Sequence, residues 1–492
     1  MSDPPPWARR YLLLKYRTTQ RASAIVKHMK AKNPVLYVHM ESRERELDAK
    51  LLVALAAAEL GFISIFGQST FLLQYAKWFP EGIYFFKGLN LVETNVMQIC
   101  SDNQRHTIIA IDEESLGVAD SVYLAKGIHP VASKLCDLVF AQGEAHREVL
   151  KRSGGFSDDQ IAVTGNPRID LLRPPLNAKF EREAKALRKR LGKFVLVNTN
   201  TGAVNSTFGD LEQFKAACKT VGWLDPHDPD DQADFDAWIT FEKANMAATE
   251  ALVYELRRAL PDYLVLLRPH PSERKETWED KFSSITGVLV ERSGNHIAWM
   301  LASQFVFHTS CTTGVEAELA GVPAISIKPH DATAAHWFLS NQVNPVVSKP
   351  SEAVMLAKSF LVNGCDPFSA TADARRALLA RQFALGEPGF AFDRIAQSLL
   401  NLLDDPKNLS DTYRWPEYTL RHMPKRSTRQ MEKFSATMEE VQARINTLAD
   451  CLGRFHDLRL VEAWDSLFAV SRPDKLTLPD DGQMFRLKPS AA

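Results

Sequence analysis

A turn rich in hydroxyl groups separates an apolar run from a helical pattern in QFVFHTSCTTGVEAELAGVPAISI, residues 304–327. Free backbone N–H groups and the dipole at a helix start bind anions, and hydroxyl groups add donors without bulk. The segment therefore predicts a phosphate site, with a carboxylate placed to accept hydrogen bonds from ribose hydroxyls. The alternative is an ordinary capped helix with a first-turn acid. The residues concerned are Ser310, Thr312, Thr313, Gly314 and Glu316.

A second polar segment, LVLLRPHPSE (264–273), begins as an apolar run and ends in a turn with two prolines. Because proline fixes the backbone, Arg268 and His270 are expected at the carboxyl edge of a sheet. Cationic or proton-donating groups at that edge suit a leaving phosphate. A purely structural histidine in the turn is the other interpretation.

Three acids, Asp112, Glu113 and Glu114, follow the apolar run that begins at Thr107. A carboxylate at the end of a strand can take a proton from an acceptor hydroxyl, which typically accelerates transfer by roughly 10² to 10⁴-fold. We expect Asp112 or Glu113 to be this base. His270, neutral or protonated, and Arg268 would face it. A solvated acidic loop is the alternative.

Two further loops are candidates for the lining of the site. The segment VNTNTGAVNS (197–206) contains small polar residues, and its backbone N–H groups suit a donor phosphate or sugar, although a tight turn without a ligand fits equally well. Charged residues near the ends of the first strands are expected to meet the acceptor, or else to form a solvated helix start. The residues of the two sets are Asn200, Thr201 and Gly202, and Glu41, Arg43, Arg45 and Glu114.

Short β-branched and apolar runs alternate with helical patterns, which is typical of parallel sheets covered by helices. A charged helical segment with a Pro pair, 173–193, links the two sets of runs. We therefore expect an α/β protein with two Rossmann-like doubly wound domains in a GT-B-like arrangement, with the ligand in the cleft between them. The expected strands are 35–40, 62–67, 83–88, 107–113, 138–143 and 161–165, followed by 194–200, 263–271, 288–291, 304–310 and 322–328.

The predicted domains are an N-terminal domain at 34–175, which takes the acceptor, and a C-terminal domain at 176–405, which takes the donor. Residues 1–33 form a basic N-terminal arm, which either binds an anionic membrane surface or is a solvated helix. Residues 406–492 are expected to be a helical C-terminal extension. Its apolar stripe predicts a helix docked on the protein itself, with a homodimer or partner contact as the alternative. The stripe consists of Val441, Ile445, Leu448, Leu452 and Phe455.

Composition narrows the function classes. The chain has 492 residues, 45% of them hydrophobic, and a formal net charge of -1, so no global field recruits nucleic acid. The six cysteines are scattered without a CxxC pair, which fits neither a disulfide framework nor a zinc site. No apolar run approaches the roughly 18 residues of a membrane span, and the start is too short for a signal peptide. We expect a cytoplasmic protein, with the basic arm as an option for peripheral contact with the inner face of the membrane.

The sequence resembles the bacterial surface carbohydrate biosynthesis proteins, and more distantly the GT-B capsule and lipopolysaccharide glycosyltransferases that use CMP-activated sugars. The resemblance runs from about Val35 to Asp404. It rests on ERELDAKLLVALAAAELG (44–61), IIAIDEE (108–114), VTGNPRIDLLRP (163–174), LRPHP (267–271) and HTSCTTGVEAELAGVPAI (308–325).

The resemblance implies roles for three motifs. An acidic D/E-D/E-G motif that carries the base falls on residues 112–114, and an HP motif that contacts the donor phosphate falls on His270 and Pro271. A hydroxyl motif that binds the nucleotide phosphate falls on Ser310, Thr312 and Thr313. Ser115 replaces the expected glycine, with Gly117 two positions later, so the choice of base among the three acids stays open.

The function implied is transfer of a sugar from a nucleotide donor, CMP-Kdo or a CMP-nonulosonate, to a surface polysaccharide or a lipid-linked acceptor. No cofactor besides the donor and no metal is expected, because no second carboxylate group lies at a matching strand end. A nucleotide-sugar epimerase or a polyol-phosphate transferase on the same scaffold is one alternative. A non-catalytic assembly subunit of the polysaccharide machinery is the other.

Overall fold

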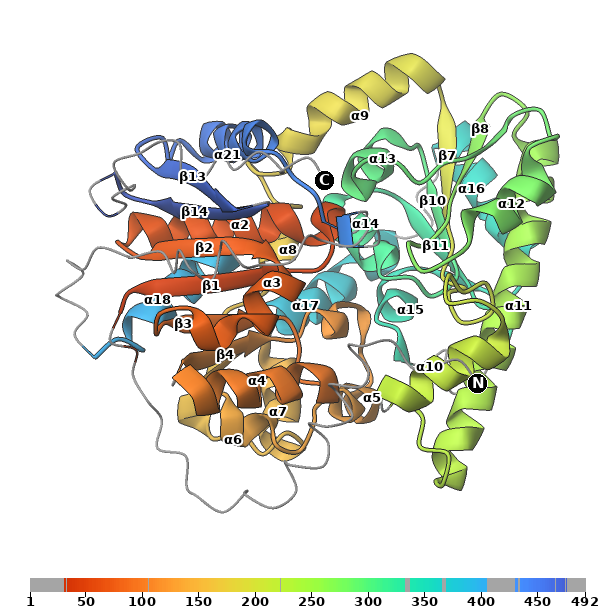
Figure 1. Ribbon diagram of the computed structural model, residues 1–492. Coiled ribbons are helices and arrows are strands. Elements are labelled where there is room, and N and C mark those ends of the chain that lie inside the picture. Colours follow the sequence, from red (N-terminus) through yellow and green to blue (C-terminus); the bar gives the residue numbers. More distant parts are fainter. Residues whose placement is uncertain are drawn as a thin grey trace, which may run out of the picture.

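Two separate β-sheets organise the chain, and Figure 1 shows the two domains side by side. The computed structural model describes residues 31, 33–104, 106–221, 223–331, 337–364, 369–404, 430–431, 434–464, 466–473 and 475. The basic arm predicted at 1–33 therefore lies almost wholly outside the described residues. Two Rossmann-like domains in a GT-B-like arrangement, as the sequence predicts, are confirmed by this architecture.

The first sheet has the order β13-β14-β2-β1-β3-β4-β5-β6, and β1 to β6 are parallel. Alternate side chains of β1 point to opposite faces of the sheet, with Leu36 in one apolar core and Tyr37 in another. This burial on both faces explains the continuous apolar runs of the sequence. The parallel strands are β1 (Val35–Met40), β2 (Ile63–Gln68), β3 (Ile83–Phe86), β4 (Thr107–Ile111), β5 (Leu138–Ala141) and β6 (Ile161–Val163).

The second sheet is parallel throughout and has the order β12-β11-β10-β7-β8-β9. Counted within the domain, this is the order of a nucleotide-binding doubly wound sheet. The sequence analysis missed β12, whose two residues are too few to form a recognisable apolar run. The strands are β7 (Phe194–Asn198), β8 (Leu264–Arg268), β9 (Val288–Val290), β10 (Val306–His308), β11 (Ala324–Ile327) and β12 (Val346–Val347).

Helices connect the strands and cover both sheets (Figure 1). The first domain contains α2 (Arg43–Glu59), α3 (Ser69–Gln74), α4 (Leu91–Gln104), α5 (Ser121–Lys126), α6 (Ala132–Leu135), α7 (Glu144–Arg152) and α8 (Pro167–Asp170). The linker is α9 (Ala178–Leu191), and the second domain contains α10 (Leu211–Val221), α11 (Pro229–Ala259), α12 (Lys275–Phe282), α13 (His296–Ala302), α14 (Thr313–Ala320), α15 (Ser340–Val343) and α16 (Pro350–Asn363). Helix α17 (Ala372–Phe383) follows and contacts both α15 and α7 of the first domain. The chain continues with α18 (Ala391–Leu400) and α21 (Met438–Leu452).

The C-terminal part of the chain returns to the first domain, which differs from the predicted domain limits and from a purely helical extension. Helix α18 packs on α2 in the first domain. Strands β13 (Arg459–Trp464) and β14 (Leu467–Ser471) form a hairpin, and β14 pairs antiparallel with β2. The expectation that the extension at 406–492 is helical is therefore wrong for residues 459–471. The edge of β2 needed a partner strand, and the hairpin supplies it.

The apolar stripe at 441–455 docks on the protein itself. Val441, Ile445 and Leu448 of α21 are buried, and Arg444 on the same helix contacts Asp48 of α2 at 3.1 Å between Nη1 and Oδ1. The stripe is thus part of the apolar core that runs through α2, α9 and α18. This core also contains residues of the second sheet, so a continuous apolar cluster joins the two domains.

Candidate functional site

The strand order of each sheet identifies where a ligand would bind. Order reverses between the adjacent strands β7 and β10 in the second sheet, and between β1 and β3 in the first. In doubly wound folds ligands bind outside the carboxyl ends of strands at such a switch point. The loops and helix starts there are 199–204 and 309–314 in the second domain, and 41–45 and 87–90 in the first. These four segments contain most of the predicted site residues.

The loop after β7 is held from behind by two buried carboxylates. Glu273 Oε1 accepts hydrogen bonds from Thr199 Oγ1 (2.7 Å) and Thr201 N (2.8 Å), and Glu242 Oε2 accepts one from Ala203 N (2.7 Å). Burial raises the pKa of Glu242 to about 8. Gly202 approaches the 270–273 turn so closely that a Cβ there would overlap Ser272 Oγ. The predicted polar loop is thus present, but the backbone N–H groups of Thr201 and Ala203 donate to Glu273 and Glu242 of the protein itself.

Two hydroxyl groups at this switch point have no hydrogen-bond partner among the described residues. They are Thr201 Oγ1 after β7 and Thr309 Oγ1 after β10, and both side chains are buried. A buried polar group without a partner costs free energy, so such groups call for an explanation. Both hydroxyl groups lie at the carboxyl edge of the sheet, where ligands of doubly wound domains bind.

The turn after β8 fixes His270 in one tautomer. Nδ1 lies 2.7 Å from Ser272 Oγ and accepts a hydrogen bond from Ser272 N, so the proton sits on Nε2. Burial, with help from the positive charges of Arg45 and Arg292, lowers the pKa of His270 to about 3. His270 is therefore a neutral hydrogen-bond donor at neutral pH.

Arg268 does not project from the sheet as predicted. Its guanidinium donates to the carbonyl oxygens of Ser293 (2.8 Å) and Gly294 (2.7 Å), and burial lowers its pKa to about 10. Arg268 thus holds the loop before α13 in place. Pro271 is exposed beside it and has no N–H group to donate.

The hydroxyl turn after β10 is strained and internally bonded. Ser310 has a φ of 58°, in the left-handed region that non-glycine residues rarely adopt, and Asn341 Nδ2 donates to its hydroxyl at 2.9 Å. Asn200 Nδ2 donates to the Ser310 carbonyl at 3.2 Å, which ties the two switch-point loops together. Such strain persists only where the surroundings enforce it, and it is often found at functional sites.

The start of α14 is also held by close contacts. Thr313 Oγ1 lies 3.4 Å from Cys311 Sγ, while Thr312 shows no side-chain cap bond. A Cβ at Gly314 would overlap both His308 Nε2 and Asn344 Oδ1, which are hydrogen bonded to each other at 2.7 Å. Gly314 is therefore required for packing.

Glu316 bridges the two domains. Its Oε1 lies 3.3 Å from Arg168 Nη2 in the first domain, and its Oε2 lies 2.9 Å from His296 Nε2. Burial alone would raise its pKa, but His296 and Arg168 lower it to about 2. Both oxygens thus have protein partners, so the predicted binding of ribose hydroxyls would compete with Arg168 and His296.

A buried network of charges lies at the switch point of the first domain. Lys50 Nζ contacts Glu46 Oε2 at 2.8 Å and Glu113 Oε1 at 3.5 Å, and Lys87 Nζ contacts Glu41 Oε2 at 2.5 Å. Glu41 therefore belongs to this network, as an ion-pair partner of Lys87.

Beneath this network lie His39 and Glu93, whose Nε2 and Oε2 atoms are 3.6 Å apart. Burial lowers the pKa of His39 well below its ordinary value and raises that of Glu93 to about 7.

The three acids after β4 lie in different surroundings. Burial raises the pKa of Asp112 to about 7; its Oδ1 accepts the Glu114 N–H at 3.2 Å, and its Oδ2 lies toward Gly127. Asp112 thus shapes the loop from inside the first domain. Glu113 instead joins the charged network through Lys50, and Glu114 is exposed.

The acidic loop meets the second domain directly. A Cβ at Gly117 would overlap Thr312 Oγ1, and the Gly117 carbonyl accepts the Leu339 N–H at 2.8 Å. The glycine that the motif expects at position 115 is thus replaced by one at 117, which permits this contact.

Arg45, on α2, carries a charge that acts on both halves of the site. Arg45 has no ion pair or hydrogen bond among the described residues. Burial alone would lower its pKa, but the charges of Glu114, Glu46 and Glu316 outweigh burial and raise it. Its charge thus acts on carboxylates of both domains and on His270. Arg43 instead turns to the C-terminal segment, where Nη1 contacts Glu440 Oε2 at 3.3 Å.

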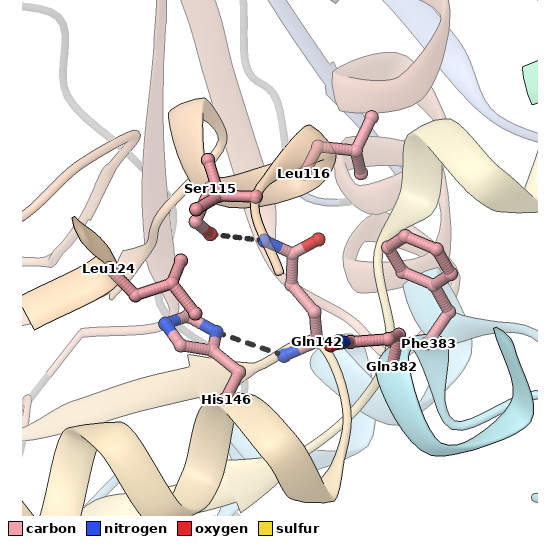
Figure 2. A pocket seen from close by; sticks show the side chains of 8 residues that line it. Ser115, Leu116, Leu124, Gln142, His146, Gln382 and Phe383 are labelled. Carbon is pink, nitrogen blue, oxygen red and sulfur yellow. Dashed lines mark hydrogen bonds between the residues drawn. The ribbon is translucent and has the colours of Figure 1, made fainter. Parts of the chain in front are cut away.

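A small pocket of about 10 Å³ lies behind the acidic loop, lined in part by Ser115, Gln142 and His146. Figure 2 shows Gln142 bonded to Ser115 and to His146, through Nε2 to Oγ and through N to Nδ1. This volume holds about one water molecule, so the pocket supports the loop and is too small for a sugar.

Sequence reasoning missed Lys50, Lys87 and His296. Lys50 carried a signal, because it is a charged residue within the apolar helix LDAKLLVALAAAE. Among the described residues, no group of three or more His, Cys, Asp or Glu side chains is arranged to hold a metal ion. Within the same residues, no helix combines the length and the apolar character that crossing a membrane requires.

No protein-family model matches the sequence, and no curated protein matches it significantly. Among solved structures, the wall teichoic acid polymerase TagF with CDPG is 12% identical over 80% of this chain and 93% of that chain, with a TM-score of 0.49. The UDP-GlcNAc 2-epimerase of Methanocaldococcus jannaschii is 13% identical over 75% and 99%, with a TM-score of 0.48. A putative UDP-N-acetylglucosamine 2-epimerase of Listeria monocytogenes is 14% identical over 75% and 96%, with a TM-score of 0.45. We therefore infer the function of this chain from its own residues.

Proposed function

We propose that the chain is a glycosyltransferase that moves a sugar from a nucleotide donor to a surface polysaccharide or a lipid-linked acceptor. CMP-Kdo or a CMP-nonulosonate is the favoured donor, because the resemblance described above points to CMP-activated sugars. The nucleotide would bind at the second-domain switch point, and the acceptor at that of the first domain.

One observation carries the proposal. Arg45 brings a positive charge without a protein ion pair to a place where it acts on Glu113 and Glu114 of the first domain and on Glu316 and His270 of the second. The field of one cation thus reaches a carboxylate of the first domain and a neutral imidazole donor of the second. This set suits a reaction in which a hydroxyl loses a proton while an anionic group departs.

In the proposed reaction Glu113 takes the proton of the acceptor hydroxyl, and the hydroxyl oxygen forms a bond to the anomeric carbon. The bond between that carbon and the phosphate oxygen breaks, and the nucleotide leaves with the electron pair. Arg45, the Nε2–H of His270 and the start of α14 stabilise the negative charge that develops on the phosphate. Asp112 shapes the loop that carries Glu113.

The first test is nucleotide binding, measured by calorimetry and thermal shift with CMP, CDP, UDP and GDP. We expect selective stabilisation by CMP that is lost in His270→Ala and weakened in Thr201→Val, which removes the unpartnered hydroxyl and keeps the volume. His227→Ala is the matched control, because His227 is an exposed histidine of the same domain. No response to any of the four nucleotides would contradict the proposal.

The second test is the reaction itself. Purified protein given CMP-Kdo should release CMP faster when a lipid-linked or polysaccharide acceptor is present, and Glu113→Gln should abolish that increase. Interconversion of a nucleotide sugar without transfer would instead indicate an epimerase, and transfer of a polyol phosphate would indicate the other alternative.

A further inference from the structure

Lys50 is positioned to control Glu113. It lies on α2 with 4% of its side chain exposed, and its ammonium group has three N–H donors. Nζ contacts Glu46 Oε2 and the His39 carbonyl, each at 2.8 Å, which fixes its position. The third direction leads to Glu113 Oε1 at 3.5 Å.

Glu46 is itself held rigidly. Its carboxylate accepts hydrogen bonds from the backbone N–H groups of Glu41 (3.2 Å) and Ser42 (3.0 Å), and Oε1 lies 3.8 Å from Lys87 Nζ. Although burial opposes ionisation, Lys50 and Lys87 lower the pKa of Glu46. Glu46 therefore stays ionised. Because the backbone N–H groups hold its carboxylate, the Glu46 side chain has little freedom to move and keeps the Lys50 ammonium group in place.

Glu113 is the most exposed member of the chain Glu46–Lys50–Glu113, with 12% of its side chain exposed against 7% for Glu46 and 4% for Lys50. The charged groups around it are Lys50, Glu46 and Arg45 from α2, Lys87 after β3, and Arg168 from α8, with Glu114 next to it in sequence. Burial raises the pKa of Glu113, and Lys50 is the strongest of the cations that oppose this. The anchored ammonium group of Lys50 thus opposes the rise in the pKa of Glu113 that burial causes.

We propose that Lys50 is a positioning residue that holds the Glu113 carboxylate toward the interdomain junction and favours its ionised form, so that it can act as a base. The inference rests on the proposed function, in which Glu113 removes the acceptor proton. Glu46 has two effects on Glu113. It fixes the ammonium group of Lys50, and its own negative charge opposes the ionisation of Glu113.

The test is the pKa of Glu113 in two variants with opposite expected effects. An opposite charge within about 4–6 Å lowers a carboxyl pKa by roughly 1–3. Lys50→Met should therefore raise the pKa of Glu113 by about 1 or more, and Glu46→Gln should lower it, because a like charge is removed while Lys50 remains. General damage to the fold would move both in the same direction.

Difference infrared spectroscopy of the carboxyl band gives this pKa without any assay of activity, with Glu113→Gln as the reference. Lys179→Met is the control, because Lys179 is also buried and contacts α2 through Asp48, at 2.5 Å between Nζ and Oδ1, and is absent from the charges around Glu113. It should leave the pKa of Glu113 unchanged. In an active preparation, the acidic limb of the kcat/KM profile should move to higher pH in Lys50→Met and to lower pH in Glu46→Gln.

An unchanged or lowered pKa of Glu113 in Lys50→Met would overturn the inference. If that variant does not fold, Lys50→Gln takes its place, because it removes the charge and keeps a polar side chain, and an unchanged or lowered pKa of Glu113 there overturns the inference. A chain without transferase activity refutes the proposed function, while the infrared titration still reports the effect of Lys50.

Discussion

At the scale of single residues, the protonation of His270 separates two ways of stabilising a phosphate. Ser272 occupies Nδ1, and burial and two arginines lower the pKa to about 3, so the ring stays neutral across the physiological range. A neutral imidazole gives one directed hydrogen bond, whereas an imidazolium would add a charge that disappears near pH 6.5.

We predict that His270→Ala lowers kcat/KM by about 10²- to 10³-fold, as for loss of one preorganised donor. The factor should be the same at pH 6 and pH 8, because the wild-type side chain does not titrate between them. The measurement is a pH profile of both proteins. A loss that grows below pH 6.5 would mean that the imidazolium is the active form.

The position of several candidate residues at a sheet edge could be predicted from the sequence, but the orientation of their side chains could not. The turn at 310–314 and the histidine at 270 follow apolar runs, so their place at a sheet edge is readable from the pattern. Arg268 follows the same rule, yet its partners are carbonyl groups 25 and 26 residues away along the chain. The roles of Lys50 and Arg168 depend on contacts between segments far apart in sequence, which no local pattern contains.

At the scale of elements, the acidic loop depends on the absence of a side chain at Gly117. Gly117 touches Thr312 at the start of α14, so the loop and the helix position each other across the domain boundary.

We predict that Gly117→Ala pushes the acidic loop away from α14. The free energy of unfolding should fall by about 1–3 kcal/mol, as for an overpacked contact, and the fall in kcat/KM should be larger than this when it is expressed as a free energy. Gly386→Ala is the control, because a Cβ there would meet nothing within 4 Å and the residue is exposed. Equal effects of the two substitutions on kcat/KM would contradict this role for Gly117.

The strands of the two parallel sheets were easier to predict than the structure of the C-terminal segment. The parallel strands are buried on both faces and appear as apolar runs between helices, so their positions follow from the sequence. The hairpin of β13 and β14 lacks that alternation with helices, and its place beside β2 is set by an open sheet edge elsewhere in the chain.

At the scale of the whole molecule, stability depends on the hairpin that completes the first sheet. The ring of Phe468 in β14 stacks on Phe66 in β2, with centroids 5.6 Å apart, and both side chains are fully buried.

We predict that Phe468→Ala lowers the free energy of unfolding by about 3–5 kcal/mol, as for other buried aromatic residues. Chemical denaturation followed by circular dichroism is the measurement. Phe208→Ala is the control, because Phe208 is 52% exposed and its truncation removes little buried surface. A Phe468→Ala protein as stable as this control would show that the hairpin is dispensable.

The return of the chain to its first domain has a consequence for synthesis. Residues 459–471 emerge from the ribosome only after the entire second domain has been made, although they pair with a strand that begins at Ile63. Domains usually fold in the order in which they are translated. Here the second sheet can close first, while the edge of β2 waits for its partner and depends on protection from other nascent chains.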